Sequence, residues 1–229
     1  MIFVLSTSNH NCINKQYIRV DPFAKYSIKV GVYGKPYYIT LDERARIEQL
    51  DLSAYPDLAV SRDIFVFQCC IGCRVGDLWK MTKSDIVEGA VEYLPHKTRG
   101  KSAKVIRVPL NAVARRIYDR YADNGDARLL PFGARGQYNR DIKRIFRLAG
   151  IDRLVTVIDP LTGAEGKRPL CEVASSHLAR RTFVGNLYKQ ARDLNLVCAL
   201  SGHTAGSKAV ARYYDVDEEM RRDLVKMIE

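Results

Sequence analysis

Apolar residues dominate the stretch between residues 55 and 73, which reads YPDLAVSRDIFVFQCCIGC. This pattern predicts a mostly buried helix that ends at Gly72, because glycine accepts the left-handed backbone that follows many helices. A shorter helix is predicted to begin at Thr40, since Thr40 and Glu43 have the spacing of a capping box. The first part of the sequence therefore predicts helical structure.

The chain between residues 84 and 110 changes to short runs of β-forming residues. Glu88 and Gly89 separate the first two runs, and the polar residues 98–103 lie before the third. Runs divided by such turn residues predict a small antiparallel sheet. A second hairpin is predicted within residues 153–170, with its turn at the sequence DPLTG.

Helical periodicity returns after each predicted hairpin. Asn111 is placed to cap a helix on which Val113, Ile117 and Tyr121 share one face. Apolar positions between residues 138 and 146 repeat with the same period and stop before a glycine. Further helices are predicted in residues 175–191, 193–203 and 215–229. The fold class expected is mainly α with a small antiparallel β-sheet, an α+β arrangement.

The pattern also suggests a division of the chain. Residues 1–39 show little periodicity and are predicted to be a linker or remnant that precedes the domain. The domain is predicted to span residues 40–229 and to end in a charged tail helix over residues 215–229. Met220, Leu224 and Met227 have helical spacing in this tail, which packs either on its own domain or into a neighbouring molecule.

Composition and charge narrow the classes of function. Lysine and arginine outnumber aspartate and glutamate by 37 to 26, which gives a formal net charge of +11 over 229 residues. This excess of positive charge indicates a polyanionic partner, with nucleic acid as the leading choice. The sequence contains no apolar run of the roughly 18 residues that a membrane helix needs and no signal peptide, so a cytoplasmic protein is expected.

The cysteines indicate neither a disulfide framework nor a metal centre. Three of the six cysteines, Cys69, Cys70 and Cys73, lie inside the apolar stretch and are expected to be buried thiols. No second pair of cysteine or histidine residues has ligand-like spacing, and there is no acidic cluster suited to Mg²⁺ and no glycine-rich phosphate loop. The sequence thus predicts a protein without metal or cofactor.

Four segments concentrate charge in otherwise apolar surroundings: GCRVGDL, HKTRGK, SSHLARRTF and SGHTAGSKAVARYY. Each has an ordinary structural explanation when it is taken alone. Arg74 can cap a helix or pair with Asp77, Lys97 can lie at a solvated hairpin tip, and His177 can make a satisfied hydrogen bond at the start of a helix.

Together these segments have the groups that phosphoryl transfer without a metal requires. Two arginines can offer planar forks of donors to the oxygens of a phosphodiester. A lysine and a histidine can supply acid and base. A tyrosine becomes a nucleophile where surrounding cations favour its phenolate, and a basic pocket is expected to do this.

With these motifs the sequence resembles the tyrosine recombinases, the integrase family of DNA strand-exchange enzymes. The resemblance rests on their order along the chain, which is GCRVGDL, the lysine of HKT, HLAR, SGH and then tyrosine. It covers roughly residues 22–229 and is greatest to integrases of Bacteroides-type mobile elements. It implies the catalytic-domain fold of that family and a bacterial, DNA-associated protein.

The resemblance also implies a role for each matching residue. Arg74 and Arg180 would clamp the scissile phosphate, and His203 would hydrogen-bond it. His177 would handle the proton of the attacking Tyr213. Lys97 would protonate the leaving 5′ oxygen.

Asp77 matches a carboxylate that orients the pocket in the family. The alternative is that Asp77 is a surface partner of Arg74.

This sequence departs from the family pattern in several places. Arg181 stands where many members have histidine. The loop after Lys97 is long, so Lys101 and Lys104 remain alternatives for the acid. Tyr213 lies ten residues after His203 (213 − 203 = 10) where many members have nine.

Of the tyrosine pair, Tyr213 is the predicted nucleophile, and Tyr214 is assigned to packing. The separate N-terminal core-binding domain that members usually carry is expected to be absent.

The expected activity is site-specific recombination or integration of DNA through a 3′-phosphotyrosyl intermediate, without metal or ATP. The expected partners are double-stranded DNA and further copies of the chain in a tetramer, with no membrane and no small-molecule substrate. One alternative is a DNA-binding module without turnover that regulates a full-length recombinase. Another is an activity like that of type IB topoisomerases.

Overall fold

The computed structural model describes residues 34–96, 104–204, 206–213, 222 and 225–228. The chain divides into two units, one of residues 34–157 and 166–229 and the other of residues 1–33 and 158–165. The larger unit contains the elements discussed below, except for two strand-end residues, Ile158 and Glu165. Four features predicted from the sequence lie outside the described residues: the segment 1–33, the loop that contains Lys97 and Lys101, Tyr214, and most of the tail helix.

Two helices form the first part of the larger unit. Helix α2 (Leu41–Glu48) begins with the predicted capping box, in which the Glu43 N–H donates to Thr40 Oγ1 at 3.1 Å. The Thr40 N–H donates in return to Glu43 Oε2 at 2.9 Å. Helix α3 (Pro56–Ile71) ends at Gly72, whose φ of 70° is the left-handed value expected there. Both sequence predictions are confirmed.

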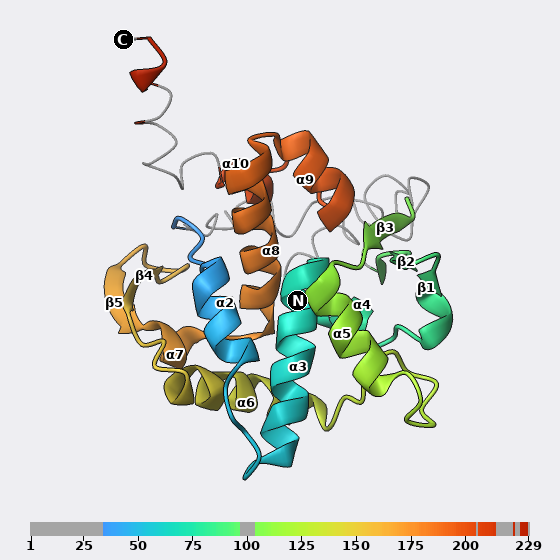
Figure 1. Cartoon of the computed structure of the whole chain (residues 1–229). Helices are drawn as coiled ribbons and strands as arrows, with labels where there is room; N and C mark the ends of the chain where they lie inside the picture. Colours follow the sequence, from blue (N-terminus) through green and yellow to red (C-terminus); the bar gives the residue numbers. More distant parts are fainter. Residues whose placement is uncertain (1–33, 97–103, 205, 214–221, 223–224, 229) are drawn as a thin grey trace, which may run out of the picture. The chain divides into compact units, whose positions relative to one another are not determined.

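Helix α3 is the element around which the larger unit is assembled. It contacts α2, α5 (Ala112–Tyr121), α6 (Arg135–Leu148) and α8 (Ser176–Ala191), as Figure 1 shows. Phe65, Phe67 and Ile71 of α3 have no exposed surface. A helix that is surrounded in this way has an apolar side chain at most positions, which explains the long apolar run.

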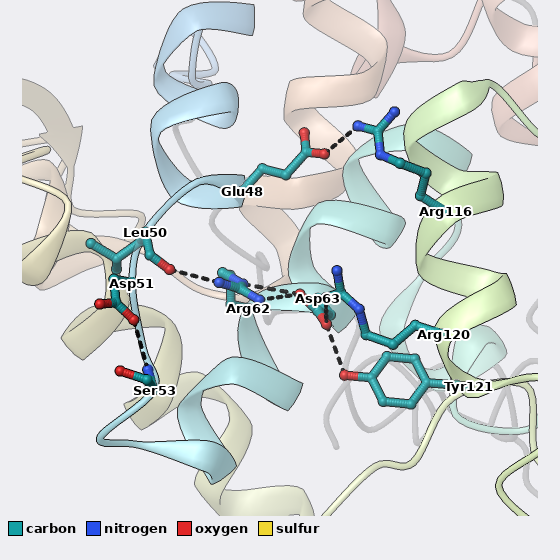
Figure 2. A network of polar contacts seen from close by, with 9 residues as sticks. All are labelled: Glu48, Leu50, Asp51, Ser53, Arg62, Asp63, Arg116, Arg120 and Tyr121. Carbon is teal, nitrogen blue, oxygen red and sulfur yellow. Dashed lines mark hydrogen bonds and ion pairs between the residues drawn. The ribbon is translucent and has the colours of Figure 1, made fainter.

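A charged network fastens α5 to α3 (Figure 2). Asp63 is 4% exposed, and its carboxylate accepts hydrogen bonds from the Tyr121 hydroxyl at 2.8 Å and from Arg62 Nε at 2.9 Å. It also forms an ion pair with Arg120. Arg62 Nη1 donates to the Leu50 carbonyl at 2.6 Å and so ties down the connection between α2 and α3. A buried carboxylate is tolerated here because its oxygens are paired.

The predicted small sheet is present and antiparallel. Its strands β1 (Ile86–Val87), β2 (Ala90–Tyr93) and β3 (Ile106–Pro109) lie in that order. Glu88 and Gly89 both have positive φ, 47° and 75°, as the tight turn between β1 and β2 requires. The second predicted hairpin is formed by β4 (Leu154–Ile158) and β5 (Glu165–Pro169).

The other elements are mostly helical. Asn111 caps α5 as predicted, since its Oδ1 accepts from the Ala114 N–H at 2.9 Å. The remaining elements are α4 (Val75–Leu78), the 3₁₀ helix η1 (Lys83–Asp85), α7 (Leu170–Val173), α9 (Leu194–Ser201) and α10 (Lys208–Ala211). None of the helices in the described part of the chain is long and apolar enough to cross a membrane.

Candidate active site

A cavity of about 630 Å³ is lined by residues from the end of α3, from α4, from α6 and from the first turn of α8. Arg74, Asp77 and His177 are among its lining residues. These three residues belong to two of the charged segments identified in the sequence. The fold therefore brings together groups that are about a hundred residues apart in the chain.

Arg74 has a guanidinium available to the cavity. It is half-buried and holds the N-cap position of α4 in an extended backbone conformation. No hydrogen bond or ion pair joins its side chain to another described residue. The ordinary explanation that Arg74 pairs with Asp77 is therefore wrong for this structure.

Asp77 is buried rather than on the surface. It is 8% exposed, and its Oδ1 accepts the backbone N–H of His96 at 2.9 Å. Its Oδ2 is buried without a hydrogen-bond partner among the described residues. The alternative of a surface partner for Arg74 is excluded by this burial. Asp77 instead holds the backbone at His96, the residue that directly precedes Lys97 in the sequence.

Arg180 joins two helix ends. It is 2% exposed, and its Nη1 donates to the carbonyl oxygens of Gly72 and Ser201, each at 2.7 Å. Both carbonyls lie at helix C-termini, where the backbone carries partial negative charge. Burial and the nearby Arg74 lower the pKa of Arg180 from its ordinary value. Through Gly72 this side chain is connected to the loop that carries Arg74.

His203 contacts Arg180 directly. Nη2 of Arg180 lies 3.1 Å from both ring nitrogens of His203. The hydroxyl of Ser201 donates its single proton to the Val197 carbonyl at 2.6 Å and lies 2.8 Å from Nδ1 of His203. Placing the ring proton on Nδ1 satisfies both neighbours, because Nδ1–H then donates to Ser201 Oγ and Nε2 accepts from Arg180 Nη2.

The protonation state of His203 follows from its surroundings. Burial, followed by the positive charges of Arg180 and Arg74, lowers the pKa of His203 to about 3. The ring is thus neutral at pH 7, with an unprotonated Nε2. Ser201 was missed in the sequence, although it stands within the SGH motif that drew attention to His203.

His177 lines the cavity and is exposed, although part of its side chain is desolvated by the protein around it. This partial burial and the charges of Arg181, Arg180 and Arg74 lower the pKa of His177 to about 4. A neutral imidazole at the edge of a cationic cavity can accept a proton at pH 7.

Tyr213 occupies an apolar cluster beside this site. It is 5% exposed and packs among residues of α8, α9 and α10, including Val184, Val197 and Val210. Burial raises the pKa of Tyr213 to about 12, although Arg181, Arg180 and Arg212 act in the opposite direction. The expectation that surrounding cations favour the phenolate is wrong for this structure, because desolvation outweighs the charges.

The predicted residues thus fall into three places. Arg74, Asp77 and His177 line the cavity. Arg180 is bonded to the Gly72 carbonyl and contacts His203, and Tyr213 lies in an apolar cluster of α8, α9 and α10. Lys97 lies outside the described residues, while its alternative Lys104 is exposed. Within the ranges that the structure describes, no three histidine, cysteine, aspartate or glutamate side chains are grouped to hold a metal ion.

Comparison with known proteins places this arrangement in context. The model of the phage integrase family matches residues 39–220. The fold is similar to that of lambda integrase(75-356) in a dimer bound to a COC′ core site, with a TM-score of 0.63 and 21% identity over 94% of this chain and 71% of that one. The lambda integrase catalytic core gives a TM-score of 0.51 and 20% identity, over 76% of this chain and 95% of that one.

A second group of similar structures consists of Xer recombinases. XerH bound to a palindromic difH substrate has a TM-score of 0.59 and 16% identity, over 83% of this chain and 53% of that one. XerA has a TM-score of 0.57 and 16% identity, and this chain spans 66% of its length. No curated protein sequence matches the chain. The predicted fold, a mainly helical domain with small antiparallel sheets, is confirmed.

Proposed function

The chain belongs to the phage integrase family, and we propose that it contains the catalytic domain of a DNA strand transferase that cleaves and rejoins DNA through a 3′-phosphotyrosyl bond. The observation that carries the proposal is that two of the charged segments meet at one cavity. Arg74 and His177 line it, and Arg180 is bonded to the Gly72 carbonyl two residues before Arg74.

Double-stranded DNA is the substrate that fits this chemistry. The net charge of +11 favours association with a polyanion. The lambda integrase structures include one bound to a core site, and XerH is bound to a difH substrate. The site-specific recombination that such relatives suggest is proposed for this chain as well, in DNA integration by a mobile element of the Bacteroides type.

Two arginines would hold the scissile phosphate. Arg74 is half-buried and its guanidinium has no bonded partner among the described residues, so it can offer a fork of donors to two phosphate oxygens. Nη1 of Arg180 is held by two carbonyls, so the phosphate would be met by Nη2, which has a second N–H besides the one near His203. Charge that develops in the transition state is then met by preorganised donors.

His203 is proposed to become a donor when the phosphate binds. The neutral ring has no proton on Nε2 and cannot donate from it. A phosphate beside Nε2 would raise the pKa of the ring by its negative charge, so the ring would take up a proton. His203 would then donate to a phosphate oxygen while Nδ1 stays bonded to Ser201.

The chemical step would begin at Tyr213. Its Oη attacks phosphorus, a bond forms between Oη and phosphorus, and the bond from phosphorus to the 5′ oxygen breaks. His177 accepts the phenolic proton, and Lys97 gives a proton to the departing 5′ oxygen. The products are a 3′-phosphotyrosyl bond and a free 5′-hydroxyl. The phosphodiester bond energy is kept in this intermediate, so rejoining needs neither ATP nor metal.

Tyr213 must turn out of its apolar cluster for this attack. Its 5% exposure and raised pKa describe the protein without DNA. Catalytic geometry in such states often tightens only in the complex with substrate. Strand exchange would further require four protomers on two DNA sites, an arrangement supported by the lambda integrase tetramer bound to a Holliday junction.

A nicked suicide DNA substrate tests the proposal. The wild-type protein is expected to form a covalent adduct with this DNA in the presence of EDTA, detected by its altered mobility in denaturing gels. Tyr213→Phe is expected to bind the same DNA without forming the adduct. An adduct formed by Tyr213→Phe would remove Tyr213 from the proposed role, and Tyr214→Phe is the matched control.

The burial of Tyr213 favours a second candidate, a DNA-binding module without turnover that regulates a full-length recombinase. It predicts salt-sensitive DNA binding and no adduct under any of these conditions. A further candidate is relaxation of supercoils in the manner of type IB topoisomerases. Incubation with supercoiled plasmid distinguishes it, because only that activity relaxes the plasmid without exchanging strands.

A further inference from the structure

Residues 34–39, which we name the lead-in segment, lie along helix α8. At one end the Ile39 N–H donates to Thr182 Oγ1 at 3.3 Å. Asn186 Nδ2 donates to the Ile39 carbonyl at 2.8 Å. Both partners belong to α8, which also carries His177 and Arg180. The lead-in segment is thus fastened to the helix that supplies two groups of the site.

Two aromatic side chains extend this attachment along α8. The guanidinium carbon of Arg181 lies 4.8 Å from the centre of the Tyr37 ring, within the range of a cation–π contact. The Tyr38 ring covers Gly185 so closely that a Cβ there would lie 2.6 Å from it. Glycine at this position therefore allows the segment to approach the helix backbone.

The other end of the lead-in segment contacts the residue before Tyr213. Arg212 Nε donates to the Gly34 carbonyl at 3.0 Å, and Nη2 of the same guanidinium donates to the same oxygen. Arg212 is half-buried, and 178 residues separate it from Gly34 in the sequence. One edge of the guanidinium is thus directed at a single backbone atom, and a planar fork suits this geometry.

We propose that Arg212 is a positioning residue that ties Tyr213 to the lead-in segment, an inference that rests on the proposed role of Tyr213 as the nucleophile. The segment is anchored on α8 at Ile39 and on Arg212 at Gly34. It therefore sets the distance between the backbone of Tyr213 and the helix that carries Arg180. The phenol ring can turn toward the phosphate while the backbone of Tyr213 keeps its distance from α8.

The bond from Arg212 to the Gly34 carbonyl, which we name the tether, also couples Tyr213 to events outside the site. A contact with DNA or protein that displaces Gly34 shifts the residue next to Tyr213, because Arg212 follows the Gly34 carbonyl. The anchors on Thr182 and Asn186 limit this displacement to the end near Gly34. Arg212 is therefore the point at which the lead-in segment controls the reacting group.

Nitration of tyrosine tests the tether without DNA and without catalysis. Arg212→Ala is expected to raise the rate at which tetranitromethane nitrates Tyr213 by about 10-fold, as local opening exposes the ring. Arg212→Lys, which keeps one donor for the Gly34 carbonyl, is expected to give a smaller increase. Tyr188, 8% exposed in the same cluster, is the internal control and keeps its wild-type rate.

Peptide mass spectrometry identifies the nitrated residue in each variant. An unchanged rate at Tyr213 in Arg212→Ala overturns the tether, and so does an equal rise at Tyr188, which reports general loosening of the cluster. This result is independent of whether the protein cleaves DNA, so a failure of the proposed function is seen separately, as an absent adduct in the wild type.

Single-turnover cleavage tests the positioning role. Arg212→Ala is expected to lower the cleavage rate constant by about 10- to 100-fold at saturating DNA, because small displacements of a reacting group reduce rates by such factors. The Kd for DNA stays within about 3-fold, which separates positioning from binding. A substrate with sulfur as the 5′ bridging atom, whose leaving group needs no proton, does not restore the rate. Restoration by that substrate assigns Arg212 to the leaving group and overturns the proposal.

A double-mutant cycle tests the coupling through the segment. Asn186→Ala removes one of the two anchors at Ile39 and is expected to slow cleavage less than Arg212→Ala does. The double variant is expected to be no slower than Arg212→Ala alone, within about 2-fold, because both changes act on one connection. If the rate losses of the two single variants multiply in the double variant, the two residues act independently and coupling through the segment is contradicted. Faster cleavage by Arg212→Ala would contradict it as well.

Discussion

The hydroxyl of Ser201 lies 2.8 Å from Nδ1 of His203 and fixes the tautomer of that ring. The tautomer of His203 follows from the hydrogen bonds of Ser201, because the one proton of the hydroxyl is already donated to the Val197 carbonyl at 2.6 Å. Nδ1 is thereby assigned as the donor, and Nε2 is left to accept from Arg180 Nη2. A residue that touches no substrate thus determines which nitrogen His203 presents.

Ser201→Ala is expected to relax this tautomer. Long-range ¹H–¹⁵N NMR spectra should show His203 protonated at Nδ1 in the wild type and a larger Nε2–H population in the variant. His203→Gln identifies the signal among the four histidines of the chain. A wild-type His203 ring protonated at Nε2 would contradict the assignment of its proton to Nδ1.

The affinity for DNA is expected to increase as the pH falls from 8 to 5.5. His203 and His177 have pKa values of about 3 and about 4 without DNA, so both are neutral in this range. Bound phosphate raises these pKa values, which makes binding take up protons, and proton uptake strengthens binding at lower pH. Fluorescence anisotropy measures the Kd at each pH, and His203→Gln is expected to flatten the dependence.

The same lowered pKa values make a prediction for stability. The histidines of the unfolded chain bind protons near their ordinary pKa of 6.5, whereas the pKa values of His177 and His203 in the folded protein are about 4 and about 3. The unfolded state therefore takes up more protons between these limits, and stability is expected to decrease as the pH falls through this window. Urea unfolding at a series of pH values measures it. The decrease is expected to be smaller in a His177→Gln, His203→Gln double variant, and an equal decrease there would contradict the assignment to these histidines.

Gly72→Ala is expected to destabilise the fold by about 1–3 kcal/mol, because two unfavourable effects coincide. The φ of Gly72 is 70°, and a Cβ would lie 2.2 Å from the Phe183 ring. Gly136→Ala is the matched control, since its nearest atom would be 3.8 Å away, on Arg140. Urea denaturation followed by circular dichroism measures both variants, and equal stabilities would contradict both the backbone strain and the clash with Phe183.

Asp77→Ala and Asp77→Asn are expected to differ. Asn retains an Oδ1 that can accept the His96 N–H, whereas Ala removes the acceptor of this part-buried hydrogen bond. If Asp77 acts by holding the chain before Lys97, adduct formation falls about 10-fold in the alanine variant and stays near wild type in the asparagine variant. Equal losses in both variants would assign the effect to the carboxylate charge.

Several elements could be predicted from the sequence because their causes are local. The capping box at Thr40, the helix stop at Gly72 and the turn at Glu88 and Gly89 each depend on residues within a few positions of one another. Periodicity likewise identified the buried helix α3 and the sheet, since burial repeats with the geometry of each element. The order of the charged motifs also indicated the family, because that order can be read from the sequence without knowledge of the fold.

The contacts that define the site depended on tertiary structure. Arg180 bonds to the Gly72 carbonyl across 108 residues, and Arg212 bonds to the Gly34 carbonyl across 178. Whether Asp77 is paired with Arg74 or with the backbone of His96, and whether cations or burial determine the pKa of Tyr213, follows from which segments pack together. The sequence by itself determined the local elements and the chemical groups available, because propensity and periodicity act over short separations. Only the fold decided their partners and their solvation, because hydrogen bonds and desolvation are set by whichever distant atoms packing brings near.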